Sequence, residues 1–136
     1  MHFSTVTVIL AGLCATAQAW EVVAYDNTDR CDANDNTRYR SITGAPGLTR
    51  CFTFDQDMPG TGCREYIRGG AANQGCISGS LLPSSVLLSA GRCVLFDQPG
   101  CQGRYSDTNR PVDHYCLSFA RDNWGKIRSF SCSGWT

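Results

Sequence analysis

The chain has 136 residues, and its twelve Lys and Arg balance its twelve Asp and Glu, so the formal net charge is zero. Eleven of the basic residues are arginines, yet none of them forms a run that would track a phosphate backbone, which argues against nucleic-acid binding. This length predicts one domain with a core of moderate size.

The first nineteen residues have the pattern of a secretory leader. Val6 to Leu13 is mostly apolar but too short to span a bilayer. It is followed by Ala17-Gln18-Ala19, the small-x-small pattern that signal peptidase accepts. We therefore expect residues 1–19 to be a signal peptide and residues 20–136 to form one secreted, extracellular domain without a transmembrane segment.

Beyond Cys14 in the leader, the chain has an even number of cysteines, which in a short secreted domain predicts a disulfide framework of up to four bonds. The eight are Cys31, Cys51, Cys63, Cys76, Cys93, Cys101, Cys116 and Cys132. They allow 105 pairings. Proximity favours Cys63 with Cys76, and Cys93 with Cys132 would join the two ends of the second half. No Cys-x-x-Cys pair is present, so we expect no zinc site.

Short strand patterns alternate with Gly and Pro turns, and no long 3.6-residue periodicity is present. In chain order, strands are expected at residues 20–25, 38–43, 48–54, within 81–88, on both sides of the Pro99-Gly100 turn in 93–105, at 115–119 and at 126–132. Residues 55–79 contain six glycines and are expected to be mainly loop. The pattern predicts an all-β sandwich or barrel.

The domain contains an internal repeat. Three segments of the first half recur in the same order in the second half: Val23–Asp26 as Val94–Asp97, Cys31 with Arg38-Tyr39 as Cys101 with Arg104-Tyr105, and Cys51–Phe54 as Cys116–Phe119. The first copy then carries about twenty extra residues, including Cys63 and Cys76, before the second copy begins.

The second copy resembles the βγ-crystallin family, whose signature is an aromatic residue, an acidic residue and, seven positions after the aromatic, a hairpin glycine. Phe96, Asp97 and Gly103 occupy these positions. The resemblance implies two Greek-key motifs that form a disulfide-stabilised β-sandwich. Motif one would span residues 20–90, with an insertion at about 55–79, and motif two residues 91–136.

Microbial members of that family often bind calcium through loops with paired Asn or Asp residues and hydroxyls. The resemblance implies weak calcium candidates at Ser84 and Asp122, although Lys126 lies where a hydroxyl is usual. Calcium prefers six to eight oxygen ligands. A calcium-binding structural extracellular protein, of a wall, matrix or spore, is therefore the alternative function, and otherwise no cofactor is expected.

Catalytic residues are poorly represented. His114 is the only histidine after the leader, and no Gly-x-Ser-x-Gly motif accompanies it. Glu21 and Glu65 are the pair that a glycosidase mechanism would use, but a domain of this size has little room for a substrate cleft. We expect no enzymatic activity, and a hydrolase or a protease inhibitor is the least favoured function.

The make-up of the chain resembles small fungal secreted effectors and antimicrobial toxins. We expect a monomeric binding protein whose partner is a protein, a glycan or a microbial or host surface. The insertion is the expected interaction loop, through Arg64, Tyr66 and Arg68, because Tyr and Arg are enriched at interfaces.

Overall fold

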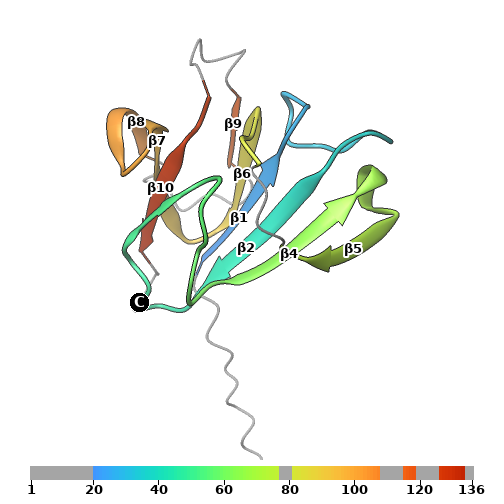
Figure 1. Ribbon diagram of the computed structural model, residues 1–136. Coiled ribbons are helices and arrows are strands. Elements are labelled where there is room, and N and C mark those ends of the chain that lie inside the picture. Colours follow the sequence, from blue (N-terminus) through green and yellow to red (C-terminus); the bar gives the residue numbers. More distant parts are fainter. Residues whose placement is uncertain (1–19, 77–80, 108–114, 119–125, 134–136) are drawn as a thin grey trace, which may run out of the picture.

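The computed structural model describes residues 20–76, 81–107, 115–118 and 126–133, so the predicted leader, His114 and Asp122 lie outside the described residues. In these ranges the protein has ten strands and one short 3-10 helix. None of the described segments is a helix long and apolar enough to cross a membrane. The strands form two antiparallel sheets (Figure 1), which confirms the predicted all-β class.

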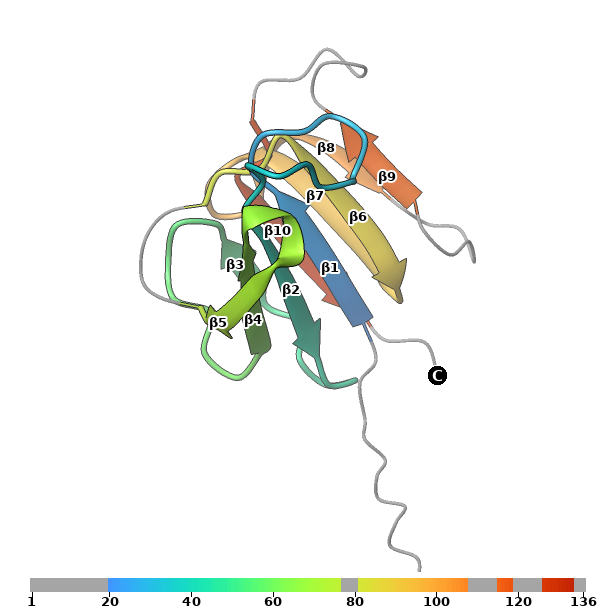
Figure 2. The same cartoon turned by 90° about the vertical axis from the view of Figure 1, so that its right-hand side faces the viewer.

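The larger sheet has six strands in the order β5-β4-β2-β1-β6-β9. Its strands are β1 Trp20–Tyr25, β2 Tyr39–Gly44, β4 Gly62–Ile67, β5 Ala72–Gly75, β6 Ser85–Ala90 and β9 Tyr115–Ser118. The smaller sheet has the order β3-β10-β7-β8, with β3 Cys51–Thr53, β7 Arg92–Gln98, β8 Gln102–Asp107 and β10 Ser129–Ser133. Figure 2 looks onto the outer face of the larger sheet.

The core lies between the two sheets because apolar residues alternate along the strands. Trp20 on β1 is fully buried, and its ring centroid lies 5.7 Å from that of Phe130 on β10. The indole Nε1 donates a hydrogen bond to the Leu48 carbonyl at 3.0 Å. Gly44, paired with Trp20 in the sheet, leaves room for this ring, since a Cβ there would lie 2.1 Å from it. Each large side chain buried in this way contributes about 1.5–3 kcal/mol.

The two halves of the chain have matching strand orders. In the first half the order β2-β1-β6 is completed by β9, and in the second half the order β8-β7-β10 is completed by β3. The smaller sheet therefore contains three strands from the second half and one from the first. The larger sheet has the converse arrangement, with β4 and β5 added beside β2. The repeat seen in the sequence corresponds to a repeated arrangement of strands.

Equivalent hydrogen bonds support this correspondence. The Cys31 amide donates to Ser85 Oγ at 3.1 Å, and the Cys101 amide donates to Ser129 Oγ at 2.8 Å. Both cysteines have left-handed backbone, with φ of 55° and 59°. Each serine therefore fixes the turn of the hairpin in its own half.

The disulfides also follow the repeat. Cys31 is bonded to Cys116, and Cys51 is bonded to Cys101, so each bond joins the hairpin of one half to the third strand of the other. The other two bonds are Cys63–Cys76 and Cys93–Cys132, the two pairs favoured by the sequence. All eight cysteines of the domain are therefore oxidised. Each of the first two bonds lies within one sheet and ties together parts of that sheet that come from different halves of the chain.

The hairpin between β7 and β8 depends on Gly103. This residue has φ of 85°, and a Cβ on it would lie 2.2 Å from Asp97 Oδ1. That oxygen accepts a hydrogen bond from the Arg104 amide at 2.8 Å. The first half uses Asp26 in the same way, since its Oδ1 accepts from the Arg38 amide at 3.0 Å.

The insertion differs from the expectation of a loop. Residues 62–75 form a hairpin of β4 and β5 joined by the 3-10 turn Arg68–Gly70, and β4 pairs with β2 at the side of the larger sheet. The glycines obscured this strand pattern: Gly69 and Gly70, with φ of 69° and 100°, make the turn, while Gly62 and Gly75 lie in strands. The other eight strands lie within or close to their expected ranges.

Candidate binding face

Three tyrosines from separate strands form a stacked row on the outer face of the larger sheet. The register pairs Tyr25 on β1 with Tyr39 on β2, and Tyr39 with Tyr66 on β4. The ring centroids of Tyr25 and Tyr39 are 5.3 Å apart, and those of Tyr39 and Tyr66 are 4.8 Å apart with planes inclined by 14°. Cross-strand aromatic pairs of this kind contribute roughly 0.2–1 kcal/mol each.

The row changes from buried to half-exposed along its length. Tyr25 is 8% exposed, and burial raises the pKa of its phenol, with smaller contributions from Tyr39, Asp32 and Glu21. Tyr39 and Tyr66 are half-buried. Tyr66 is the member of the row that also lines a groove on this face.

An open groove of about 320 Å³ runs beside Tyr66 over β1, β2 and β4. Its lining includes the side chains of Glu21, Ser41, Thr43, Arg64 and Tyr66 together with Gly62. A Cβ on Gly62 would lie 2.6 Å from Thr43 Oγ1, so glycine keeps the floor of the groove low. We call these residues, with Tyr25 and Tyr39, the tyrosine face.

The polar side chains of the groove are held in place. Glu21 accepts hydrogen bonds from Ser41 Oγ at 2.5 Å and from Ser89 Oγ at 2.6 Å. Arg64 Nη1 donates to Asn73 Oδ1 at 2.9 Å across the β4–β5 hairpin. The groove thus offers a carboxylate, hydroxyls, a guanidinium and an aromatic ring from rigid strands.

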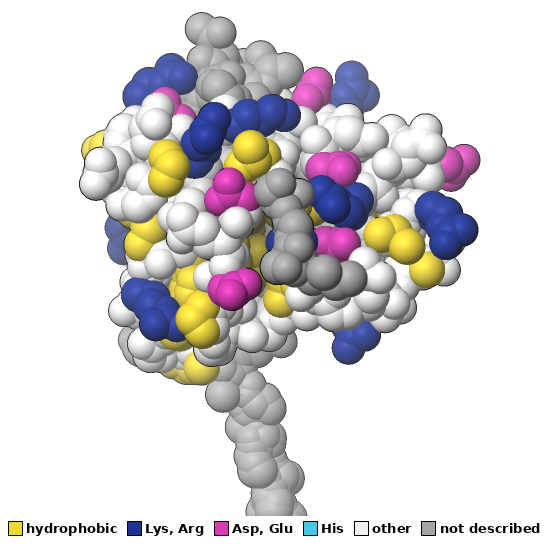
Figure 3. All heavy atoms as spheres, in the orientation of Figure 1, with side chains coloured by type: hydrophobic (Ala, Val, Ile, Leu, Met, Phe, Trp, Pro, Cys, Tyr) yellow, Lys and Arg dark blue, Asp and Glu magenta, His cyan; other side chains and the backbone are white. Residues whose placement is uncertain are grey.

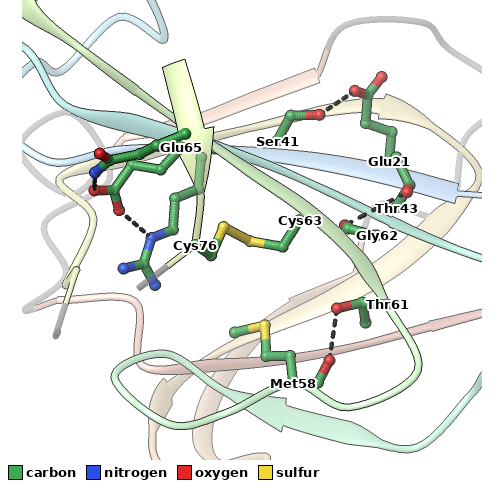
Figure 4. Close-up of a disulfide and its surroundings, with 11 residues drawn as sticks. Glu21, Ser41, Thr43, Met58, Thr61, Gly62, Cys63, Glu65 and Cys76 are labelled. Atoms are coloured by element: carbon green, nitrogen blue, oxygen red, sulfur yellow. Dashed lines mark hydrogen bonds and ion pairs between the residues drawn. A yellow bond between two sulfur atoms is a disulfide. The ribbon is translucent and has the colours of Figure 1, made fainter. Parts of the chain in front are cut away.

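On the opposite face of the β4–β5 hairpin the side chains are buried or half-buried. Glu65 is 3% exposed, accepts from Arg40 Nε at 2.6 Å and from Gln74 Nε2 at 3.1 Å, and lies near the Cys63–Cys76 bond. In Figure 4, Glu21 and Ser41 lie on one side of this disulfide, and Met58 lies on the other. The ion pair and the disulfide fix β4 and β5, and so support the tyrosine face from behind.

Some of the residues selected from the sequence are brought together and others are not. Arg64 and Tyr66 share the groove, but they lie on strand β4 instead of a loop. Arg68 is exposed at the hairpin turn, with φ of 52°, and does not line the groove. Tyr25 and Tyr39 were not recognised as partners of Tyr66, because their alignment depends on the strand register, for which the sequence carries no direct signal.

The two carboxylates considered for glycoside hydrolysis lie on opposite faces of the larger sheet. Glu21 faces the groove, whereas Glu65 alternates with Tyr66 along β4 and is buried with Arg40. A glycosidase needs its two carboxyl groups on either side of one scissile bond. Glu21 and Glu65 do not form such a pair.

Ser84, one of the calcium candidates, is engaged in other contacts. Its Oγ donates to the Asp26 carbonyl at 3.0 Å and lies 3.0 Å from Lys126 Nζ. A cation bound there would meet the lysine ammonium. The described residues contain no group of three His, Cys, Asp or Glu side chains arranged to hold a metal ion.

Charge is evenly distributed on the face of the molecule seen in Figure 3, where basic and acidic side chains are interspersed. This agrees with the balanced composition of the chain. The groove of the tyrosine face likewise carries one charge of each sign, Glu21 and Arg64.

Residues 20–132, which are most of the chain, match the family described as "Secreted LysM effector LysM14, C-terminal domain". No curated protein and no solved structure matches the chain. The match and the four disulfides agree with the predicted extracellular location, and the protein is a secreted, cysteine-rich one. The chain belongs to the family of secreted LysM effector C-terminal domains.

Proposed function

We propose that this protein is a non-enzymatic effector domain that binds an extracellular carbohydrate through its tyrosine face. The observation that carries the proposal is the groove in which Glu21, Ser41, Thr43 and Arg64 lie beside the Tyr66 ring. Binding sites combine an apolar or aromatic surface with a few fixed polar groups. Here both are supplied by neighbouring strands, which hold them more precisely than a loop would.

The chemistry of the groove favours a ligand with many hydroxyl groups. The Glu21 carboxylate accepts hydrogen bonds, the Arg64 guanidinium donates them, and the hydroxyls of Ser41 and Thr43 do both. A sugar ring presents donors and acceptors around its edge and C–H groups on its faces, which suit an aromatic neighbour such as Tyr66. The groove is open and shallow, as suits one or two units of a longer chain rather than an enclosed small molecule.

The family supports the effector part of the proposal. The matching description names a secreted effector and specifies its C-terminal domain. We extend to this chain the role of a secreted domain that acts on its surroundings by recognition. The choice of a carbohydrate rests on the groove, and an antimicrobial action remains a prediction from the composition.

The architecture supports a further part of the proposal, a βγ-crystallin-like sandwich of two Greek-key motifs. The strand orders β2-β1-β6-β9 and β8-β7-β10-β3 exchange one strand between the halves, as a paired Greek-key arrangement would. Asp97 and Gly103 lock the β7–β8 hairpin as the family signature implies. The β4–β5 hairpin is then an addition to motif one that builds the groove.

The experiment is a calorimetric titration with neutral, N-acetylated and uronic-acid oligosaccharides. We expect one of these classes to bind, and Tyr66→Ala to weaken that binding at least tenfold, which is about 1.4 kcal/mol. Arg128→Ala is the matched control, because this exposed arginine lies outside the tyrosine face, and it should bind as the wild type does. Unchanged binding by Tyr66→Ala, or no binding of any sugar class, contradicts the proposal.

A further inference from the structure

Strand β8 forms one edge of the smaller sheet and carries the most exposed large hydrophobic side chain among the described residues. Tyr105 is 66% exposed. On its inner side β8 pairs with β7, and no strand of the described ranges pairs with its other side. Figure 1 shows β8 at the outer end of this sheet. Unpaired backbone groups on an edge strand are a template for another strand.

The first half of the chain shows what fits on such an edge. Strand β2 is the equivalent of β8, and Tyr39 is the equivalent of Tyr105 in the sequence repeat. The edge of β2 is covered by the antiparallel strand β4, which places the Tyr66 ring 4.8 Å from the Tyr39 ring. Among the residues that the structure describes in the second half, the ring beside Tyr105 is that of Phe96, at 6.3 Å and inclined by 45°.

The strand that would complete the second half must be extended, have a free edge and carry an aromatic residue opposite Tyr105. Strand β8 of another copy meets all three conditions. We propose that β8 of one copy pairs antiparallel with β8 of a second copy, so that the two Tyr105 rings stack across a two-fold axis. Such an interface uses the same surface on both subunits and is closed. It is independent of the tyrosine face.

The register about Tyr105 places no like charges directly opposite one another. Arg104 would lie opposite Ser106 of the second copy, and Gly103 opposite Asp107. The Arg104 side chain is already directed to Asp97, with Nε 3.1 Å from Oδ2. Like charges directly opposite one another across a strand pair would be destabilising, and this pairing avoids them. The inferred dimer departs from the monomer expected from the sequence.

The test is the molar mass of the secreted protein as a function of concentration, by sedimentation equilibrium. We expect the mass to rise from one chain to two, and Tyr105→Lys to keep it at one chain because two lysines would then face each other at the axis. Asn73→Lys places the same charge on β5, which is an edge strand of the other, larger sheet. This variant should dimerise as the wild type does. A mass of one chain at all concentrations up to about 1 mM overturns the proposal.

Hydrogen exchange of the wild-type protein provides a second readout that needs no variant. Amides of residues 102–107 should exchange more slowly as the concentration rises, while those of residues 72–75 should not change. A dimer that persists in Tyr105→Lys, or one that protects residues 72–75 instead, also overturns the proposal, because another surface would then form the contact.

Discussion

Tyr39 and Tyr66 stack with their ring centroids 4.8 Å apart, although Tyr66 belongs to a hairpin that has no counterpart among the described residues of the second half. The insertion therefore changes an ordinary sheet edge into a wider sheet with a continuous aromatic row. The groove lies where β4 adds Gly62, Arg64 and Tyr66 to residues of β1 and β2. This relationship links the extra residues of the first half to the proposed function.

The β7–β8 hairpin should depend on Gly103. We expect Gly103→Ala to destabilise the protein by at least about 1–2 kcal/mol, the cost of a left-handed residue with a side chain, because φ is 85° and Asp97 fills the space. Gly47→Ala is the matched control, since nothing lies within 4 Å of a Cβ there. Urea denaturation measures both variants, and equal stabilities would contradict this account of the turn.

The Cys63–Cys76 bond should hold the β4–β5 hairpin. We expect the double substitution Cys63→Ser with Cys76→Ser to cost about 3 kcal/mol, as expected for a loop with a sequence separation of 13. Hydrogen exchange should accelerate in residues 62–75 and remain slow in β7 and β10. Uniform acceleration across both sheets would show instead that this disulfide stabilises the whole domain.

The buried ion pair behind the groove should stabilise the protein only while both partners are present. Glu65→Gln leaves the Arg40 guanidinium facing a neutral amide, and we expect a loss of about 3–5 kcal/mol in unfolding free energy. Arg40→Met combined with Glu65→Leu should lose less than Glu65→Gln alone, because no buried charge is left without its partner. Thermal unfolding of the wild type, Glu65→Gln and the double variant tests this order of stability. A double variant less stable than Glu65→Gln would refute it.

Tyr25 should make the fold sensitive to alkaline pH. Burial raises the pKa of its phenol in the folded protein, whereas the unfolded value is about 10. The unfolded chain therefore loses this proton first, so the contribution to stability is complete below pH about 10 and is lost as pH rises through the folded pKa. Above pH about 10, the urea midpoint should fall less steeply with pH in Tyr25→Phe than in the wild type. Tyr105→Phe is the control, because Tyr105 is exposed, and its midpoint should fall as steeply as that of the wild type. Equal slopes would contradict the assignment.

Much of the fold follows from local patterns in the sequence. The repeated aromatic-acidic pairs identify the ends of β1 and β7. In each pair the aspartate, Asp26 or Asp97, accepts a hydrogen bond from a backbone amide of the returning chain. The short spacing of Cys63 and Cys76 identifies their bond. These features act over short distances or recur in both halves, so they are visible without a structure.

The tyrosine face was only partly predictable. Arg64 and Tyr66 were selected for their residue types, but the strand that carries them begins at Gly62 and is followed by the turn glycines Gly69 and Gly70, which made the segment resemble a loop. The stacking of Tyr25, Tyr39 and Tyr66 depends on pairings between residues that are far apart in the chain. Glu21 enters the groove through the same register, and a shift by one residue would turn it toward the core.

The most direct measurement of the central claim is an NMR titration of isotope-labelled protein with the oligosaccharide class that binds in calorimetry. We predict amide shifts concentrated at Glu21, Ser41, Arg64 and Tyr66, and a Kd of roughly 10 µM to 1 mM, as expected for a shallow open site. Amides of β7, β8 and β10 should not move. Shifts confined to the smaller sheet, or no shift with any sugar, would contradict carbohydrate binding at the tyrosine face.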